Sequence, residues 1–276
     1  MSSSVRRHSI AQDVRSTIST RYKRVTKAIN NVFWDSDSET AHSFYVGSFG
    51  RGTAIDTSDV DILVELPSSD FDRFTSINGN GQSRLLQAVK NAVLNTYPNS
   101  DVRGDGQVVV IAFSDGIIYE ILPAFKNETI YGWDGTYKYP DTHMGGNWMS
   151  TNPKAEIEAM ESKDGYSESN GLLTATCQHI RYIRDQHYSS YHLSGIVIDS
   201  FAYLAIGGWH YLREGEVQSN GSNSYEEYLL KKYNEISGYG VVIPPLRAPG
   251  SMMSVNTLGS WETLGKVLRK MAQGGE

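Results

Sequence analysis

The sequence contains almost no cysteine, since Cys177 is the only one among 276 residues. One thiol excludes an intrachain disulfide framework and a zinc site built from several cysteines. No stretch approaches the roughly 20 apolar residues that a membrane-spanning helix needs. The residues after Met1 are polar and then basic, without the apolar core of a secretory signal. We therefore expect a cytoplasmic protein without a membrane anchor.

Positive charge is also in short supply. The chain has 25 Lys and Arg against 31 Asp and Glu, a net charge of −6, and a pI near 5.7. Constitutive binding of duplex DNA is not expected, because it needs a broad basic face. The charge is uneven, with residues 1–30 basic and residues 31–70 acidic. This arrangement suits a divalent cation and a phosphorylated ligand, although two solvated faces would also explain it.

Hydrophobic periodicity predicts an α+β fold. In the first half we expect helices at residues 9–34 and 85–94 and strands at 44–46, 60–64, 108–113 and 117–122. In the second half we expect helices at residues 153–160, 172–186, 193–206, 225–236 and 261–271. These elements indicate a mixture of helices and strands over residues 1–145 and a C-terminal helical lobe over residues 146–276. We expect the two parts to pack with a cleft between them.

Residues 45–66, YVGSFGRGTAIDTSDVDILVEL, contain the most informative pattern. Gly47, Gly50 and Gly52 permit close approach of the backbone to a ligand, and Ser48 adds a hydroxyl. The spacing is not the dinucleotide-binding G-x-G-x-x-G, and no G-K-[ST] follows, so a Rossmann domain and a P-loop ATPase are both unsupported. Taken alone, this glycine loop could equally be an ordinary turn.

Two acids, Asp59 and Asp61, follow the glycine loop in an apolar run that we predict to be a strand. Side chains alternate across a strand, so both carboxylates would share one face. Neighbouring carboxylates repel and raise each other's pKa, and a divalent cation removes that cost. Glu120 supplies a third acid in another apolar strand. The three acids predict a site for two Mg²⁺ ions, or Mn²⁺, of the kind used in phosphoryl chemistry.

This combination resembles a known family. Gly47-Ser48, Arg51-Gly52-Thr53-Ala54, Asp59-Val60-Asp61 and an acid three residues before Pro123 resemble the motifs of the DNA polymerase β-like nucleotidyltransferases. The chain looks most like the bacterial cGAS/DncV-like nucleotidyltransferases (CD-NTases). This resemblance implies a polymerase β-like core over residues 1–145, a mixed sheet with flanking helices. The segments RYKRVTKAINNVFW, TNPK, CQHIRYIRDQ and HLSGIVIDSFAYLA extend the resemblance to about residue 210. The family usually has Asp where this chain has Glu120, whose carboxylate lies one methylene further from the backbone.

The resemblance implies roles for individual residues. Gly47 and Ser48 would hold the β- and γ-phosphates of a donor nucleotide, and Asp59 and Asp61 would ligate both metal ions. Glu120 would ligate the ion that activates the attacking hydroxyl and help to accept its proton.

The resemblance also points to residues of the second half. Arg184 and Arg181, one helical turn apart, would reach the nucleotide triphosphate, although an exposed helix face would explain them as well. Ser194 would contact the nucleotide or only cap a buried helix.

The implied reaction is Mg²⁺-dependent attack of a ribose hydroxyl on the α-phosphorus of a ribonucleoside triphosphate such as ATP or GTP. The product would be a cyclic or linear oligonucleotide second messenger that activates an effector in anti-phage defence (CBASS). Two alternatives remain: a nucleotidyltransferase acting on RNA ends or on a protein, and a catalytically inactive nucleotide-binding regulator. The sequence leaves open which bases are joined, the linkage, the ring size and the oligomeric state.

Overall fold

The computed structural model describes residues 4–217, 224–238 and 245–274. They form two compact units. The sheet unit comprises Ala11–Gly50 and Ser58–Lys154, and the helical unit comprises Met1–Ile10, Arg51–Thr57 and Ala155–Glu276. Segment Arg51–Thr57 therefore packs in the helical unit, although the residues on either side of it belong to the sheet unit. The predicted boundary after residue 145 stays a prediction.

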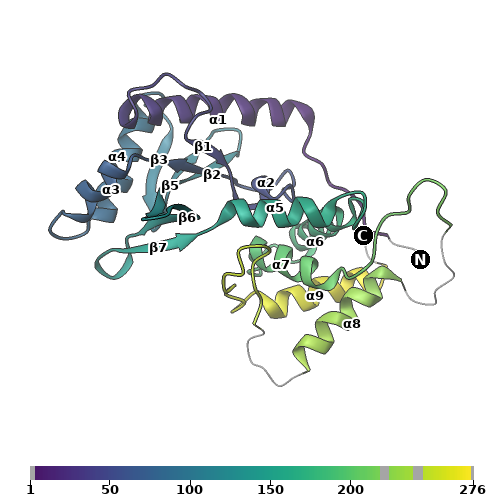
Figure 1. The fold of residues 1–276 in the computed structure, drawn as a ribbon. Coiled ribbons are helices and arrows are strands. Elements are labelled where there is room, and N and C mark those ends of the chain that lie inside the picture. The colour runs from purple at the N-terminus through teal and green to yellow at the C-terminus, as the bar shows by residue number, and fades with distance from the viewer. Residues whose placement is uncertain (1–3, 218–223, 239–244, 275–276) are drawn as a thin grey trace. The chain divides into compact units, whose positions relative to one another are not determined.

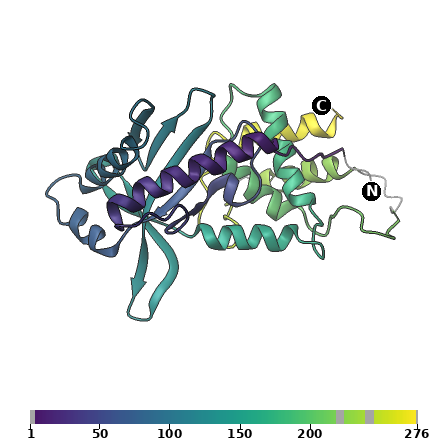
Figure 2. The ribbon, with the colours of Figure 1, turned by 90° about the horizontal axis from the view of Figure 1, so that it is seen from above.

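A mixed sheet forms the centre of the sheet unit. Its strands are β1 (Ser43–Tyr45), β2 (Val60–Glu65), β3 (Asp101–Asp105), β4 (Val108–Ala112), β5 (Ile118–Thr129), β6 (Gly132–Asp141) and β7 (Asn147–Thr151). The main order is β1-β2-β5-β4-β3, and β6 pairs with β5 and with β7. Strands β2 and β5 run parallel, while the other pairs are antiparallel. The second half of β5 continues with β6 as a hairpin beyond β4 (Figure 2).

Helices cover one face of this sheet. Helix α1 (Gln12–Phe33) runs along it (Figure 1) and packs against β2 and against α4 (Gly81–Leu94). The short helix α3 (Ser68–Thr75) packs on α4 and β5. Apolar residues of α1 at helical spacing, such as Ile18, Val25 and Ile29, share one core with inward residues of β2, β4 and β5. This packing gives the sheet a rigid covered face and leaves the side chains of Asp61 and Glu120 on the other.

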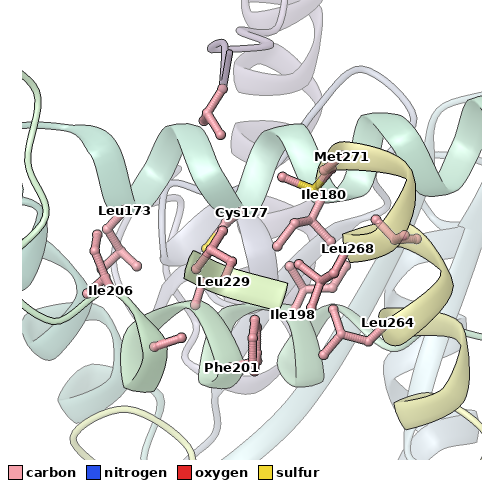
Figure 3. Packing of buried hydrophobic residues seen from close by; sticks show 14 of the residues in the cluster. Leu173, Cys177, Ile180, Ile198, Phe201, Ile206, Leu229, Leu264, Leu268 and Met271 are labelled. Carbon is pink, nitrogen blue, oxygen red and sulfur yellow. The ribbon is translucent and has the colours of Figure 1, made fainter. Parts of the chain in front are cut away.

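The helical unit is built around α7 (Gly195–Ala205), whose sequence is almost wholly apolar. The other helices are α5 (Pro153–Asp164), α6 (Leu172–His187), α8 (Tyr225–Ser237) and α9 (Trp261–Ala272). Figure 3 shows side chains of α6, α7, α8 and α9 directed toward one another in a single core. Cys177 of α6 lies fully buried in this core, and burial raises the pKa of its thiol well above the ordinary value.

The predicted α+β fold with C-terminal helices is confirmed, and each predicted helix and strand is present. Most ends shift by a few residues, but the strand predicted at 117–122 was placed too short, because β5 continues to Thr129. Helix α3 and strands β3, β6 and β7 were not predicted from the sequence. Within residues 4–217, 224–238 and 245–274, no helix combines the length and the apolarity that crossing a membrane would require.

Candidate active site

The glycine loop is a single helical turn, α2 (Gly47–Gly50), that directly follows β1 and Val46. The N–H of Gly50 donates to the carbonyl of Val46 at 2.8 Å, and the N–H of Val46 donates to the carbonyl of Asp61 at 2.9 Å. The loop is thereby fastened to β2 at the residue that carries one of the predicted acids. Ser48, the second residue of the turn, is half-buried.

Both the backbone conformation and the surroundings of Gly47 favour glycine. Its φ is +57°, a region that side chains disfavour. A Cβ at this position would overlap the Asp61 carboxylate and would lie 2.6 Å from its Cγ. The backbone of the glycine loop therefore lies directly against the Asp61 side chain.

Asp61 and Glu120 are brought together by the parallel pairing of β2 and β5, in which they stand directly opposite each other. Both are half-buried. Asp59 needs a correction, because β2 begins at Val60 and Asp59 precedes it. The alternation predicted to place Asp59 and Asp61 on one strand face therefore does not apply to Asp59, which is exposed and lies in the irregular segment before the strand.

The electrostatics of Glu120 show that negative charge is concentrated here. Burial raises the pKa of Glu120 above its ordinary value, and the charges of Asp59 and Asp105 raise it further. A hydrogen bond with Asp61 and the charge of Arg103 act in the opposite direction but do not cancel the rise in pKa. Asp105 and Arg103, on β3, were missed in the sequence because β3 was not predicted.

The three acids provide the donor set that a hard divalent cation prefers, since each carboxylate offers oxygen ligands. Asp61 and Glu120 lie on neighbouring strands, and the charge of Asp59 acts on Glu120. The donor chemistry of these residues suits Mg²⁺. No group of three or more His, Cys, Asp or Glu side chains in the described part of the chain is already gathered closely enough to hold an ion.

Arg181 lies in the helical unit and is 2% exposed. Its guanidinium donates to Asp199 Oδ1 at 2.6 Å and to Asp199 Oδ2 at 3.0 Å. It also donates to the carbonyls of Cys177 and Gly195. These buried contacts favour a structural role for Arg181, so its predicted contact with nucleotide stays a prediction that the contacts do not support.

Arg184 is more accessible than Arg181. Its Nε donates to Asp185 Oδ1 at 2.6 Å and one of its terminal nitrogens donates to the carbonyl of Leu193 at 3.1 Å. Its side chain is 21% exposed, so the guanidinium is not enclosed as that of Arg181 is. Its predicted contact with triphosphate stays a prediction.

Ser194 occupies the N-cap position of α7, but its side chain makes no capping hydrogen bond. Its backbone N–H instead donates to the hydroxyl of Ser260 at 3.0 Å. The alternative that the Ser194 hydroxyl caps this helix is therefore wrong, whereas contact with nucleotide stays a prediction.

Comparison with known families identifies the chain. The model of the Second Messenger Oligonucleotide or Dinucleotide Synthetase domain matches residues 5–164, more than half of the sequence. The chain belongs to this family. It is a CD-NTase and therefore a nucleotidyltransferase, as the resemblance of its motifs indicated. None of the curated proteins matches the chain.

Solved structures support the fold. The CdnE cyclic dinucleotide synthase from Elizabethkingia meningoseptica, solved with GTP and Apcpp, matches with a TM-score of 0.63 and 14% identity over 96% of this chain and 94% of that one. The CdnE c-UMP-AMP synthase from Rhodothermus marinus, solved with Apcpp and Upnpp, matches with a TM-score of 0.61 and 12% identity over 94% and 92%. The Vibrio cholerae DncV cyclic AMP-GMP synthase matches with a TM-score of 0.54 and 10% identity over 82% and 61%. At these identities the likeness shows a shared fold.

Proposed function

We propose that this CD-NTase joins ribonucleoside triphosphates, ATP or GTP among them, into a cyclic or linear oligonucleotide second messenger. The observation that carries the proposal is the pairing of Asp61 with Glu120 directly beside the Gly47-Ser48 turn. In this arrangement the glycine loop would bind a triphosphate, and the adjacent acids would bind cations. The family of second-messenger synthetases supports the same reading.

Different residues of the sheet unit would bind the phosphates, hold the metal ions and accept the proton. The Gly47-Ser48 backbone and the Ser48 hydroxyl would hold the β- and γ-phosphates of the donor. Asp59, Asp61 and Glu120 would hold two Mg²⁺ ions, or Mn²⁺. When bound, the ions supply charge neutralisation at the α-phosphate and lower the pKa of the attacking ribose hydroxyl. A carboxylate oxygen of Glu120 would accept the proton of that hydroxyl, and pyrophosphate would leave.

The arginines and Ser194 would act from the helical unit. Arg184, with its partly exposed guanidinium, is the better candidate for contact with the triphosphate because Arg181 is committed to Asp199. We further propose that the reaction takes place in the cytoplasm. The product would activate a separate effector in bacterial anti-phage signalling (CBASS), so the effector would be reached through the nucleotide and not through a lasting protein contact.

The test is incubation of the purified chain with pairs of α-³²P-labelled ribonucleoside triphosphates and Mg²⁺ or Mn²⁺, without any acceptor. We expect small products that resist phosphatase. They should form only when the metal is present and should not form when EDTA is included in the reaction. The matched control is the Asp59→Asn/Asp61→Asn variant under the same conditions.

Two outcomes would contradict the proposal. Labelled nucleotide that appears only on added RNA or on protein would favour a transferase acting on those acceptors. Binding of nucleotide without any product, for every pair of triphosphates and for both metals, would favour a catalytically inactive regulator.

A further inference from the structure

The motif Arg51-Gly52-Thr53-Ala54 has no role in the chemistry described so far, yet Arg51 is one of the most enclosed charges of the chain. Its Nε donates to Asp199 Oδ2 at 2.8 Å, and one of its terminal nitrogens donates to Glu156 Oε2 at 2.9 Å. Asp199 is fully buried and Glu156 nearly so. Arg51 thus bridges α5 and α7 inside the helical unit.

The charges around Arg51 balance. Two guanidinium groups, on Arg51 and Arg181, face two carboxylates, on Asp199 and Glu156. Burial alone would raise the pKa of Asp199, but Arg181 and Arg51 hold it well below its ordinary value. Asp199 therefore stays ionised, and Arg51 has a permanent buried partner.

The rest of segment Arg51–Thr57 is fastened to the same unit. The hydroxyl of Thr53 donates to Asp199 Oδ2 at 3.0 Å. Gln178 of α6 donates to the carbonyl of Ala54 at 3.3 Å, and Thr57 donates to Asp185 of the same helix. Both ends and the middle of a seven-residue segment are therefore bonded to the helical unit.

The anchored segment is covalently connected at both ends to segments of the candidate active site. Segment Arg51–Thr57 begins directly after Gly50, the last residue of the glycine turn. It ends two residues before Asp59, with only Ser58 between them. We propose that Arg51 is a positioning residue. Its ion pairs with Asp199 and Glu156 fix the segment that sets the end of the glycine loop and the start of the Asp59–Asp61 stretch. The inference rests on the proposed function in taking Gly47, Ser48 and Asp59 as site residues.

A charge-balanced variant separates positioning from stability. Arg51→Met/Glu156→Gln removes one positive and one negative charge and leaves the pair of Arg181 with Asp199 intact. Replacing a buried ion pair by uncharged groups is often neutral for stability, whereas removing one partner is not. The matched control is Arg213→Met/Glu216→Gln, which makes the same charge change at another ion pair of the helical unit.

The first measurement is hydrogen exchange of backbone amides in the full chain, which does not depend on any activity. The amides of Val46 and Gly50 are hydrogen-bonded and should exchange slowly in the wild type. In Arg51→Met/Glu156→Gln we expect them to exchange at least about tenfold faster, while the amides of α6 and α7 keep their wild-type rates. The control variant should change none of these rates.

Two exchange results would overturn the proposal. Unchanged rates at Val46 and Gly50 would mean that the ion pairs do not hold the glycine loop. An equal rise in the rates of α6 and α7 would mean that the ion pairs support the helical unit as a whole.

The second measurement is product formation by the same variants. We expect kcat/KM for the triphosphate to fall at least about tenfold in Arg51→Met/Glu156→Gln and to be unchanged in the control. The single variant Arg51→Lys keeps a cation at this position and should lose less activity than Arg51→Met/Glu156→Gln. Wild-type kcat/KM in a variant with loosened Val46 and Gly50 amides would overturn the positioning role. If the wild type itself forms no product, the proposed function fails, while the exchange result still decides whether Arg51 positions the loop.

Discussion

Asp199 of the helical unit is buried and Glu120 of the sheet unit is half-buried, but the two acids have opposite surroundings. In the helical unit, Asp199 is surrounded by guanidinium groups that hold its pKa below the ordinary value. In the sheet unit, Glu120 has a raised pKa because burial and the charges of Asp59 and Asp105 act together. A buried carboxylate whose charge is neutralised by neighbouring guanidinium groups is typical of an acid that supports the structure. A concentration of negative charge marks a place where a ligand of opposite charge is needed.

The largest effect should come from removing the acids of the sheet unit. We expect Asp59→Asn/Asp61→Asn to lower product formation at least about a thousandfold, roughly 4 kcal/mol of transition-state stabilisation. Stability should be equal or higher, because repulsion among carboxylates is relieved. Product assays together with urea denaturation measure both. Retention of half of the activity would show that these two acids do not hold the metal ions.

The comparable change in the helical unit should act on stability. Asp199→Asn leaves the guanidinium groups of Arg51 and Arg181 buried with one carboxylate fewer, and we expect a loss of about 3–5 kcal/mol in the free energy of unfolding. Urea denaturation measures it. Asp115→Asn, which breaks the exposed pair of Asp115 with Arg21, is the control and should cost less than about 1 kcal/mol.

The effect of Asp199 should depend on pH with a definite sign. Its pKa is lowered on folding, so its contribution is complete above the unfolded pKa of about 4 and is lost as the pH falls toward the folded value. The difference in stability between wild type and Asp199→Asn should therefore shrink in acid. A difference that grew in acid, or a loss no larger than that of Asp115→Asn, would remove the contrast between the two units.

Glu120 sharpens the comparison, because it differs from the Asp that is usual in the family. We expect Glu120→Gln to lower activity at least about a hundredfold, roughly 2.7 kcal/mol. Glu120→Asp should lower it less, since the carboxylate is kept but withdrawn by one methylene. Steady-state kinetics of both variants measure the effect. Wild-type rates in Glu120→Gln would instead favour the inactive regulator.

The smallest of these effects should come from Ser48. Loss of one hydrogen bond to a charged group costs roughly 1.5–3 kcal/mol, so Ser48→Ala should reduce kcat/KM for the triphosphate about ten- to a hundredfold with little change in stability. Ser16→Ala, at an exposed position of α1, is the control and should leave kcat/KM unchanged. If Ser48→Ala keeps the wild-type KM and kcat, Ser48 has no part in the site.

Much of the fold could be predicted because the main helices and strands carry their own apolar periodicity. Strand β3 could not, since Val102 is its only buried residue. Strand β6 contains glycine and proline and is held by pairing with β5 and β7. Such strands are stabilised by their partners more than by their own composition, and a single sequence does not show the partner.

The site could be predicted as chemistry but not as geometry. The acids and the glycine loop were visible, whereas the register that sets Asp61 opposite Glu120 depends on a parallel pairing between distant segments. The burial of Arg181 could not be predicted either, because it depends on how α6 packs against α7. Asp199, an acid inside an otherwise apolar helix, was the one signal that a buried cation must lie nearby.

The reactivity of Cys177, the only cysteine of the sequence, can report on opening of the core of the helical unit. Cys177 is fully enclosed and its thiol resists ionisation, and only the thiolate reacts readily with alkylating reagents. Because no second cysteine competes, the speed at which a reagent modifies the native chain counts how often this core opens. Measuring the alkylation rate of Cys177 with and without nucleotide therefore tests, without any engineered label, whether nucleotide binding makes opening of this core rarer.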